Sequence, residues 1–420
     1  MNTSERVLIC GGGIGGLSLA LSLHAAGFSD VEVFEASSEV RELGVGINLL
    51  PHAVRELTEL GLADAVATAG LETGELALYN KHGQRIWAEP RGLAAGYRWP
   101  QYSIHRGRLL GLLHGAFLDR LGAERYHLGH RVVRVDDTGL GVVVRLQDGT
   151  SAEGAVAVGV DGIHSAVRAQ FYPDEGPVLW NGQTLWRGTV WAPPFLTGRS
   201  MVVVGHFGKR VVAYPISEPR ADGLVLTNVV FEAQTAAGRP MPRQDWDHTA
   251  DPDDARTRFE TFRFDWLDLA ALIDAAPVWW QYPMADRDPL PRWSFGRVTL
   301  MGDAAHPMYP VGSNGASQAI IDARTLARSL ALEPTPEAGF AAYEDVRRPA
   351  TAAIVLSNRK VQSELCMELA EDRAPDGFDD VNDVFAPGEL ESIATEFKRL
   401  AGFDPAILNE RPSLSVEPQS

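Results

Sequence analysis

The sequence is poor in cysteine, in basic runs and in metal-ligand patterns. Its 420 residues contain two cysteines, Cys10 and Cys366, which form no CxxC or other metal-binding spacing. We therefore expect no metal site and a reducing, cytoplasmic setting. The 38 basic side chains are outnumbered by 55 acidic ones, which gives a formal net charge of −17. Such an acidic chain repels nucleic acid and anionic membranes, so neither is an expected partner.

The longest uncharged stretch, residues 7–29, is not expected to cross a membrane. It is long enough to do so, but six of its residues are glycine and five of these lie between Gly11 and Gly16. Glycines at this density break a helix, so a short buried strand, a turn and a buried helix explain the stretch better. We expect no signal peptide, no transmembrane segment and no internal repeat.

Apolar patterning predicts an α/β fold in which a Rossmann-like nucleotide-binding domain is interrupted by an antiparallel-sheet domain and followed by C-terminal helices. Between about 175 and 290, short aromatic and β-branched runs such as "TLWRGTVWA" replace the earlier buried-strand and helix patterns. The buried-strand pattern returns with "GRVTLMGD". The predicted parts are 1–174 (first part of the nucleotide-binding domain), 175–290 (sheet domain for the substrate), 291–366 (second part) and 367–420 (helical tail), with about the last ten residues disordered.

A glycine motif near the start predicts a dinucleotide site. Gly11, Gly13 and Gly16 match GxGxxG between the strand "RVLIC" and a helix, and Gly15 belongs to the same loop. The first glycine allows the tight turn, the second admits a pyrophosphate, and the third lets the helix pack on the strand. Glu35 ends the next strand, where a carboxylate binds ribose hydroxyls. The ADP half of either FAD or NAD fits this pattern.

Two later stretches favour FAD over NAD. In "VGVDGIHSAVR" (158–168), Asp161 follows a buried strand; its role is either cofactor contact or organisation of its own loop. In "LMGDAAHPMYPVGSNGASQAI" (300–320), Asp303 can accept hydrogen bonds from a sugar-like chain. The turn after it, with Pro310, Gly312 and Gly315, opens a helix whose free amides suit an anion. Elements so far apart in sequence suggest one long cofactor lying across a domain.

The three motifs in this order, with "IHRGRL" between the first two, resemble the single-component FAD-dependent aromatic hydroxylases, the group typified by para-hydroxybenzoate hydroxylase. Within that family, "LGVGINL", "PQYSIHRG", "LWRGTV" and "QYPMADRDPLPRW" are most similar to the flavin hydroxylases of phenazine-pigment biosynthesis. The resemblance covers about residues 6–360 and fades in the tail.

The resemblance implies a set of cofactor contacts. Glu35 would bind the adenosine ribose, Arg106 the pyrophosphate, and Val133 would lie beside the adenine. Asp303 would hold the ribityl chain, and the amides at Pro310–Ala316 would face the N1/C2 edge of the flavin, where reduced flavin is anionic. The remaining flavin-side positions are Val45, Gly46, Asp161, Gly312, Gly315 and Ala316.

The same resemblance implies an NADH- or NADPH-dependent monooxygenase that adds O2 at flavin C4a and hydroxylates an aromatic or N-heteroaromatic acid, with or without decarboxylation. No catalytic side chain is required. Trp186, Arg187 and Tyr214, with Pro310 and Val311, are candidates for the substrate pocket. His306 is expected to pack and hydrogen-bond rather than act as a base, and Arg41 to lie at the pyrophosphate or in a solvated loop.

Other functions are also compatible with parts of the sequence. A flavin-dependent halogenase shares the first motif, although no WxWxIP stretch is present. A plain NAD dehydrogenase would explain Gly11–Gly16 but not the later Gly-Asp segment. A non-hydroxylating flavin oxidoreductase or a flavin-binding sequestering protein would keep the cofactor site alone. The sequence leaves open whether the chain is a monomer or a homodimer.

Overall fold

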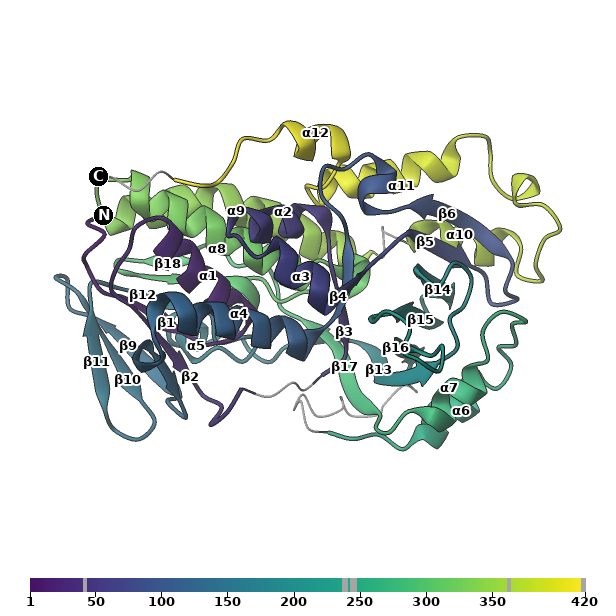
Figure 1. Cartoon of the computed structure of the whole chain (residues 1–420), viewed down its shortest axis with the longest axis horizontal. Helices are drawn as coiled ribbons and strands as arrows, with labels where there is room; N and C mark the ends of the chain where they lie inside the picture. Colours follow the sequence, from purple (N-terminus) through teal and green to yellow (C-terminus); the bar gives the residue numbers. More distant parts are fainter. Residues whose placement is uncertain (41–43, 236–240, 242–247, 361–363, 417–420) are drawn as a thin grey trace.

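The structure, a computed structural model, describes residues 1–40, 44–235, 241, 248–360 and 364–416. Figure 1 shows a parallel sheet wrapped by helices at one end and a second, mainly antiparallel sheet at the other. The C-terminal segment, yellow in Figure 1, runs along one edge of both halves. The two sheets therefore lie at opposite ends of the molecule (Figure 1).

The first sheet has six strands in the order β18-β19-β12-β1-β2-β8, and all neighbours pair in parallel except β18 and β19. Its central strand, β1, is completely buried, as a continuous apolar run in a doubly covered parallel sheet should be. The strands are β1 (Val7–Cys10), β2 (Val31–Glu35), β8 (Tyr126–Leu128), β12 (Val156–Gly159), β18 (Ser294–Phe295) and β19 (Val298–Leu300).

Helices cover this sheet and supply most of its core. The glycine-rich helix α1 packs between α8 and α4, and its apolar residues join those of the central strands in one large cluster. The helices of this half are α1 (Ile14–Ala25), α2 (Pro51–Glu59), α3 (Ala63–Ala69), α4 (Arg106–Leu121), α5 (Ala166–Phe171), α8 (Gly315–Leu332) and α9 (Pro336–Arg359). None of the described helices is long and apolar enough to cross a membrane.

The second sheet has seven strands in the order β17-β13-β16-β15-β14-β5-β6. One face packs against α6 (Pro252–Phe259) and α7 (Leu269–Ala275), and the other packs in part against α10 (Leu365–Arg373). The strands are β5 (Glu75–Tyr79), β6 (Arg85–Pro90), β13 (Leu179–Ala192), β14 (Ser200–His206), β15 (Lys209–Pro215), β16 (Val225–Gln234) and β17 (Trp280–Asp286).

Two strands of this sheet come from a part of the chain that the sequence assigns to the nucleotide-binding domain. β5 and β6 belong to residues 75–90, yet β5 pairs in parallel with β14 and extends the second sheet by two strands. The prediction that residues 1–174 serve only the first domain is therefore wrong at this point. Pairing between segments more than a hundred residues apart leaves no local pattern in the sequence.

Smaller elements complete the fold. Two three-stranded sheets have the orders β11-β10-β9 and β3-β7-β4. Their strands are β3 (Gly46–Leu49), β4 (Gly70–Glu72), β7 (Tyr102–His105), β9 (Val132–Asp137), β10 (Val142–Leu146) and β11 (Ser151–Gly154). Single turns of 3-10 helix are η1 (Gly92–Ala95), η2 (Ala123–Arg125), η3 (Gly302–Ala304), η4 (Val311–Ser313) and η6 (Val381–Asp383).

The C-terminal tail is more ordered than the sequence predicts. Two further helices, α11 (Glu389–Leu400) and α12 (Pro405–Glu410), pack on the body of the protein. Beyond α12, Ser413 donates a hydrogen bond to Glu59, and Ser415 accepts one from Arg324. The expectation of disorder over about the last ten residues is thus wrong up to residue 416; residues 417–420 lie outside the described part.

Candidate active site

The glycine loop between β1 and α1 has the geometry that a dinucleotide requires. Gly11 has a φ of +124°, and a Cβ there would lie 2.4 Å from the Val160 carbonyl oxygen. A Cβ at Gly16 would lie 1.9 Å from the Gly11 carbonyl oxygen, whereas a Cβ at Gly13 would meet nothing within 4 Å. The loop is therefore closed against the protein at Gly11 and Gly16 and open at Gly13, the position expected to face a pyrophosphate.

Glu35 is held beside this loop at the end of β2. Its carboxylate accepts hydrogen bonds from the amides of Gly12, at 2.8 Å, and Ser37, at 2.7 Å. An ionised carboxylate can accept about four hydrogen bonds, so two more donors can bind. The geometry therefore permits the predicted contact with a ribose hydroxyl. Val133 lies on β9, three residues after His130, whose amide donates to the Glu35 carbonyl. The Val133 side chain is 46% exposed, outside the enclosed part of the site.

The Gly-Asp segment, Gly302 and Asp303, follows β19. A buried hydrogen-bond network around Asp322 holds the segment's backbone in place. The Asp322 carboxylate accepts hydrogen bonds from the Gly302 amide at 3.2 Å and from Arg347 Nε at 2.7 Å, and lies 2.5 Å from His306 Nε2. Burial would raise the pKa of Asp322, but His306 and Arg347 lower it to about 2. His306 is itself buried and bonded to Asp322, which suits the expected packing and hydrogen-bonding role.

Asp303 points the other way, into the cavity. Asp303 is exposed at the cavity wall, although protein surrounds it. Burial raises the pKa of Asp303, while the nearby His306 and Arg106 oppose that rise. A second anion placed beside this carboxylate would be repelled, whereas a chain of hydroxyl groups would satisfy it.

The turn before α8 presents a helix N-terminus to the same cavity. Gly312 has a φ of +69°, and a Cβ there would lie 2.5 Å from Phe397 Cζ. The N-cap residue Asn314 makes no side-chain cap hydrogen bond, and the space at Gly315 is open. The first amides of an 18-residue helix carry its positive dipole end, so this turn suits a negatively charged edge.

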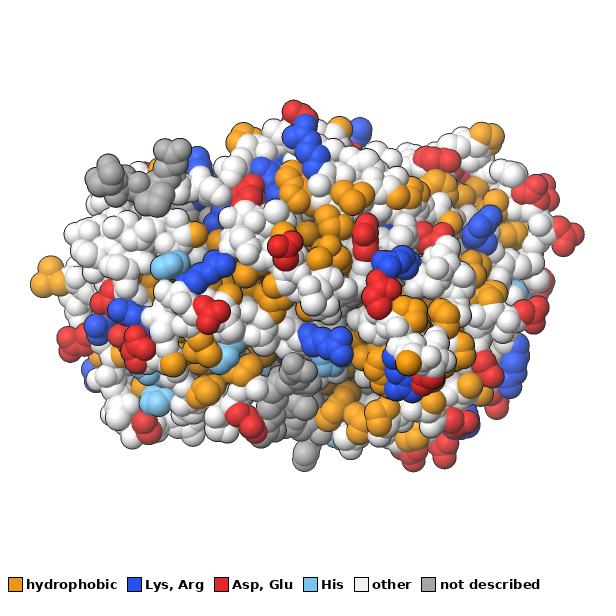
Figure 2. All heavy atoms as spheres, viewed as in Figure 1, with side chains coloured by type: hydrophobic (Ala, Val, Ile, Leu, Met, Phe, Trp, Pro, Cys, Tyr) orange, Lys and Arg blue, Asp and Glu red, His pale blue; other side chains and the backbone are white. Residues whose placement is uncertain are grey.

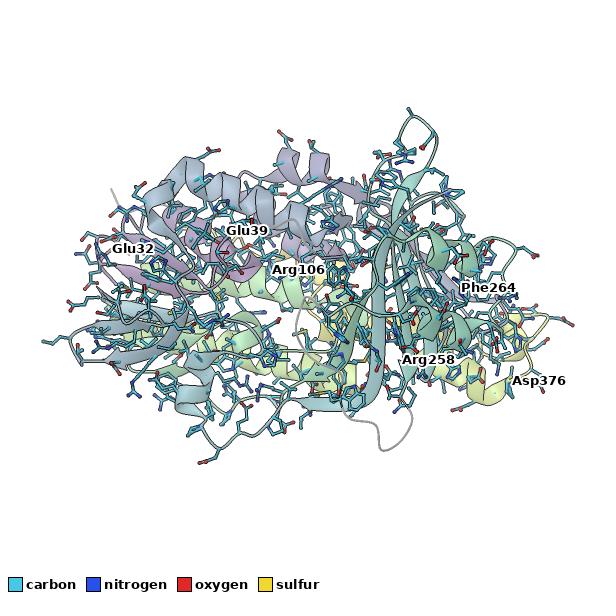
Figure 3. All side chains as sticks on the ribbon, turned by 90° about the horizontal axis from the view of Figure 1, so that it is seen from below. Glu32, Glu39, Arg106, Arg258, Phe264 and Asp376 are labelled. Carbon is cyan, nitrogen blue, oxygen red and sulfur yellow. The ribbon has the colours of Figure 1, made fainter. Side chains whose placement is uncertain are left out.

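Arg106 begins α4 at the junction of the two halves (Figure 3). Its amide donates to the Val45 carbonyl at 2.9 Å. Burial lowers the pKa of the guanidinium, the nearby Asp303 opposes this, and Arg187 adds to it. Arg106 lines the cavity with Asp303 and Gly46, while Val45 is buried behind them.

Gly46 is one of the points at which the second sheet is attached to the nucleotide-binding half. Its amide donates to Asn228 Oδ1 at 2.7 Å, and its carbonyl accepts hydrogen bonds from the Tyr214 hydroxyl at 2.8 Å and Arg187 Nη2 at 3.2 Å. Burial raises the pKa of Tyr214 to about 12, so its hydroxyl stays protonated and donates. Arg187 and Tyr214 therefore line the cavity and also anchor its wall.

Trp186 does not belong to the pocket, and that prediction is wrong. Its neighbours Leu185 and Arg187 line the cavity, but Trp186 is 2% exposed and packs in the core beneath α6 and α7. Successive side chains of a strand point to opposite faces, and the register of β13 turns Trp186 away from the cavity. Arg258 lies over its ring at 5.4 Å.

Asp161 serves its own loop. Its carboxylate accepts hydrogen bonds from the Ser165 hydroxyl and from the Ala166 amide, the latter at 2.7 Å, and so caps the start of α5. Its neighbours Val160 and Gly162 line the cavity, but Asp161 does not. Of the two roles considered, loop organisation is the one this geometry supports. Arg41 lies outside the described residues.

One continuous cavity of about 370 Å³ joins the glycine loop to the turn before α8. Gly13 and Gly15 line one part, and Pro310, Val311 and Gly312, with Gly315 and Ala316 behind them, line another. The cavity then continues over one face of the second sheet. Lining residues of this part, on the sheet and on α11, that sequence analysis did not identify include Leu76, Leu78, Trp87, Glu89, Arg91, Met201, Val203, Arg210, Val212, Val230, Glu232, Phe397 and Lys398.

Comparisons with known proteins place the chain in a family. Residues 226–357 match the family described as FAD binding domain. The chain is 45% identical over 365 residues to phenazine 1,6-dicarboxylic acid hydroxylase of Lysobacter antibioticus, covering 85% of this chain and 90% of that protein. It is 33% identical over 363 residues to 3-hydroxybenzoate 6-hydroxylase 1 of Aquipseudomonas alcaligenes, covering 84% and 88% of the two chains.

Solved structures of other proteins have the same fold as this chain. The crystal structure of Klebsiella pneumoniae HpxO complexed with FAD and uric acid has a TM-score of 0.75 at 25% identity and covers 96% of this chain and 97% of that one. A salicylate hydroxylase substrate complex has the same fold, with a TM-score of 0.74 at 24% identity and 99% coverage of both chains. This chain belongs to the FAD-dependent aromatic hydroxylases. It is a flavoprotein monooxygenase that hydroxylates aromatic or heteroaromatic substrates.

Proposed function

We propose that the chain uses FAD reduced by NADH or NADPH, together with O2, to hydroxylate a fused N-heteroaromatic acid such as a phenazine carboxylate. The single observation that carries this proposal is the continuous cavity. It joins the glycine loop, the α8 N-terminus and an apolar sheet face in one space. The relative named for phenazine 1,6-dicarboxylic acid supports the substrate class.

The residues around the cavity suit FAD. The open space at Gly13 admits a pyrophosphate, and Arg106 supplies a guanidinium fork matched to phosphate oxygens. We assign Glu35 to the ribose, Asp303 to the ribityl hydroxyls, and Val133 to the adenine. The amides of the α8 N-terminus would face the pyrimidine edge of the flavin ring.

When bound, the flavin supplies hydride acceptance from the nicotinamide and activation of O2; the protein supplies position and electrostatics. The α8 amides would stabilise negative charge on the reduced ring without a cation, at about 3–4 kcal/mol for a well-placed donor. Apolar residues of the sheet, such as Val203, Val212 and Val230, would keep water away from the oxygen transfer. No side chain needs to act as a nucleophile.

The proposal is tested with the FAD-loaded protein and a panel of phenazine, quinoline and salicylate-type acids. Substrate-stimulated NAD(P)H oxidation with O2 uptake, and a product heavier by one oxygen atom, is the expected result. A product that has also lost CO2 identifies a decarboxylating hydroxylation. A halogenated product formed only when halide is added would instead support the halogenase alternative. NAD(P)H oxidation that no aromatic acid stimulates would overturn the proposal.

A further inference from the structure

The cavity extends well beyond the flavin-facing turn, along one cross-strand row of the second sheet. Tyr214, which is bonded to Gly46, lies on β15, and the row continues through Met201 on β14 and Leu76 on β5 to Glu89 on β6. These are three strand spacings, or about 14 Å at ~4.8 Å each. The row is apolar at Met201 and Leu76 and becomes charged only at its far end.

At that far end, two cations share one carboxylate. Glu89 pairs with Arg91 Nη2 at 3.1 Å and with Lys398 Nζ at 2.7 Å, and all three residues line the cavity. Burial would raise the pKa of Glu89, but Arg91 and Lys398 lower it, so the carboxyl is ionised. The group therefore carries a net charge of one positive unit. Among the described residues, Arg91 Nε is also a buried donor without a hydrogen-bond partner.

Arg210 on β15 also lines this part of the cavity, but neighbouring carboxylates neutralise its charge. Arg210 lies between Glu232 and Glu364 and bonds to both. A third carboxylate, that of Glu368, is also close enough to act on it. An incoming carboxylate would be repelled at this cluster and attracted at the Glu89 end. Along this part of the sheet, the cavity wall therefore favours a carboxylate at the Glu89 end over one at Arg210.

We propose that Arg91 and Lys398, which we call the anion anchor, bind a carboxylate of the aromatic substrate at the end of the cavity remote from the flavin. This proposal rests on the proposed function and specifies its substrate class. A fused-ring acid extends further along this row from Tyr214 than a single-ring acid does, so it reaches closer to the anchor. The anchor therefore selects elongated acids and orients them.

The C-terminal tail builds half of this anchor. The face of α11 that lines the cavity comprises Leu390, Ile393, Ala394, Phe397 and Lys398. This is the i, i+3, i+4 spacing of one helix face, and it places the ammonium group at the end of an apolar stripe. Phe397 contacts the turn at Gly312, so the same helix touches the flavin-facing turn and the anchor.

The test is a binding measurement on the FAD-loaded protein that needs no turnover. Affinities for phenazine-1,6-dicarboxylate, for unsubstituted phenazine and for salicylate are measured by titration calorimetry or by the change in flavin absorbance. They are compared for the wild type, Lys398→Met and Lys398→Arg. The matched control is Arg399→Met, which removes one positive charge from the same helix at a side chain that is 69% exposed.

For Lys398→Met we expect the dicarboxylate to bind about tenfold or more weakly, because a charge-assisted hydrogen bond is lost. Phenazine and salicylate should bind within about twofold of the wild type. Lys398→Arg should restore most of the dicarboxylate affinity, and Arg399→Met should leave it unchanged.

Equal weakening of phenazine and the dicarboxylate in Lys398→Met would show a packing role and overturn the proposal. So would a wild type that binds the dicarboxylate no more tightly than phenazine. These outcomes are separate from failure of the proposed function, which would show as normal binding of the acid with no stimulated NAD(P)H oxidation.

Discussion

The two ends of the cavity are built in different ways. At the glycine loop, the decisive contact joins Gly12 to Glu35, 23 residues apart. At the anion anchor, it joins Glu89 to Lys398, 309 residues apart. The first end depends on backbone conformation in one βαβ unit, and the second on how a sheet edge and a C-terminal helix meet. We therefore expect binding at the glycine loop to be sensitive to changes of backbone conformation. At the anion anchor we expect single side-chain substitutions to change binding.

Among the described side chains on the face shown in Figure 2, the charge distribution on the outer surface shows no such difference between the two ends. Acidic and basic side chains are interspersed there. The charges that we propose distinguish one substrate from another lie inside, on the cavity wall.

The largest effect is expected at the backbone-built end. Gly16→Val would place Cβ 1.9 Å from the Gly11 carbonyl oxygen, and the adjoining strand and helix cannot separate without opening the core. We expect destabilisation above the ~1–3 kcal/mol of ordinary overpacking, together with loss of FAD. Urea unfolding and the flavin content of the purified protein measure both.

Gly13→Ala is the control for that substitution. Its Cβ meets nothing within 4 Å, so the FAD-free protein should unfold within about 1 kcal/mol of the wild type while FAD affinity falls. A Gly16→Val protein that keeps full flavin and normal unfolding would show that the loop is not closed as described.

Next in size is Asp322→Asn, which removes the buried carboxylate behind the Gly-Asp turn. His306 and Arg347 would lose their shared partner, and breaking a buried ion pair costs about 3–5 kcal/mol. Urea unfolding measures the loss. Asp345→Asn, on the exposed side of α9, is the matched control and should change stability by less than about 0.5 kcal/mol. Equal stability of the two variants would contradict the network.

The same carboxylate gives the protein a specific acid sensitivity. The folded pKa of Asp322, about 2, lies below its usual value of 3.8. Its contribution is therefore complete above pH 4 and is lost as the pH falls toward 2, by about 2 kcal/mol. The unfolding free energies of wild type and Asp322→Asn are measured from pH 5 downward. The difference between them should shrink by that amount as the pH falls. Parallel curves would exclude Asp322 as the source.

The smallest effect is expected where the two halves are attached. Tyr214→Phe removes one hydrogen bond to the Gly46 carbonyl, but Arg187 still donates to it, so we expect a loss of about 1 kcal/mol. Aromatic-acid affinity should also fall, because Tyr214 lines the cavity. Trp186→Phe, on the other face of the sheet, should lower stability and leave that affinity unchanged. A change in affinity for Trp186→Phe would place Trp186 back at the pocket.

Parts of the site could be predicted because their chemistry is local. The GxGxxG loop, Glu35 at a strand end and the Gly-Asp turn each lie within a short stretch with a recognisable pattern. Trp186 and Asp161 could not be placed in this way. Which face of β13 meets the cavity depends on its register with β16 and β17. Whether a carboxylate caps a helix or faces a ligand depends on the loop around it.

The sequence alone predicted the class of fold and a dinucleotide site, because the motifs that bind a dinucleotide must be contiguous to shape a turn or start a helix. The kind of reaction followed from the resemblance of those motifs to the aromatic hydroxylases. Only the tertiary structure decided that β5 and β6 join the second sheet, and that α11 brings Lys398 to Glu89. Contacts between distant segments follow from the burial of whole faces, and no short stretch of sequence records which face will meet which.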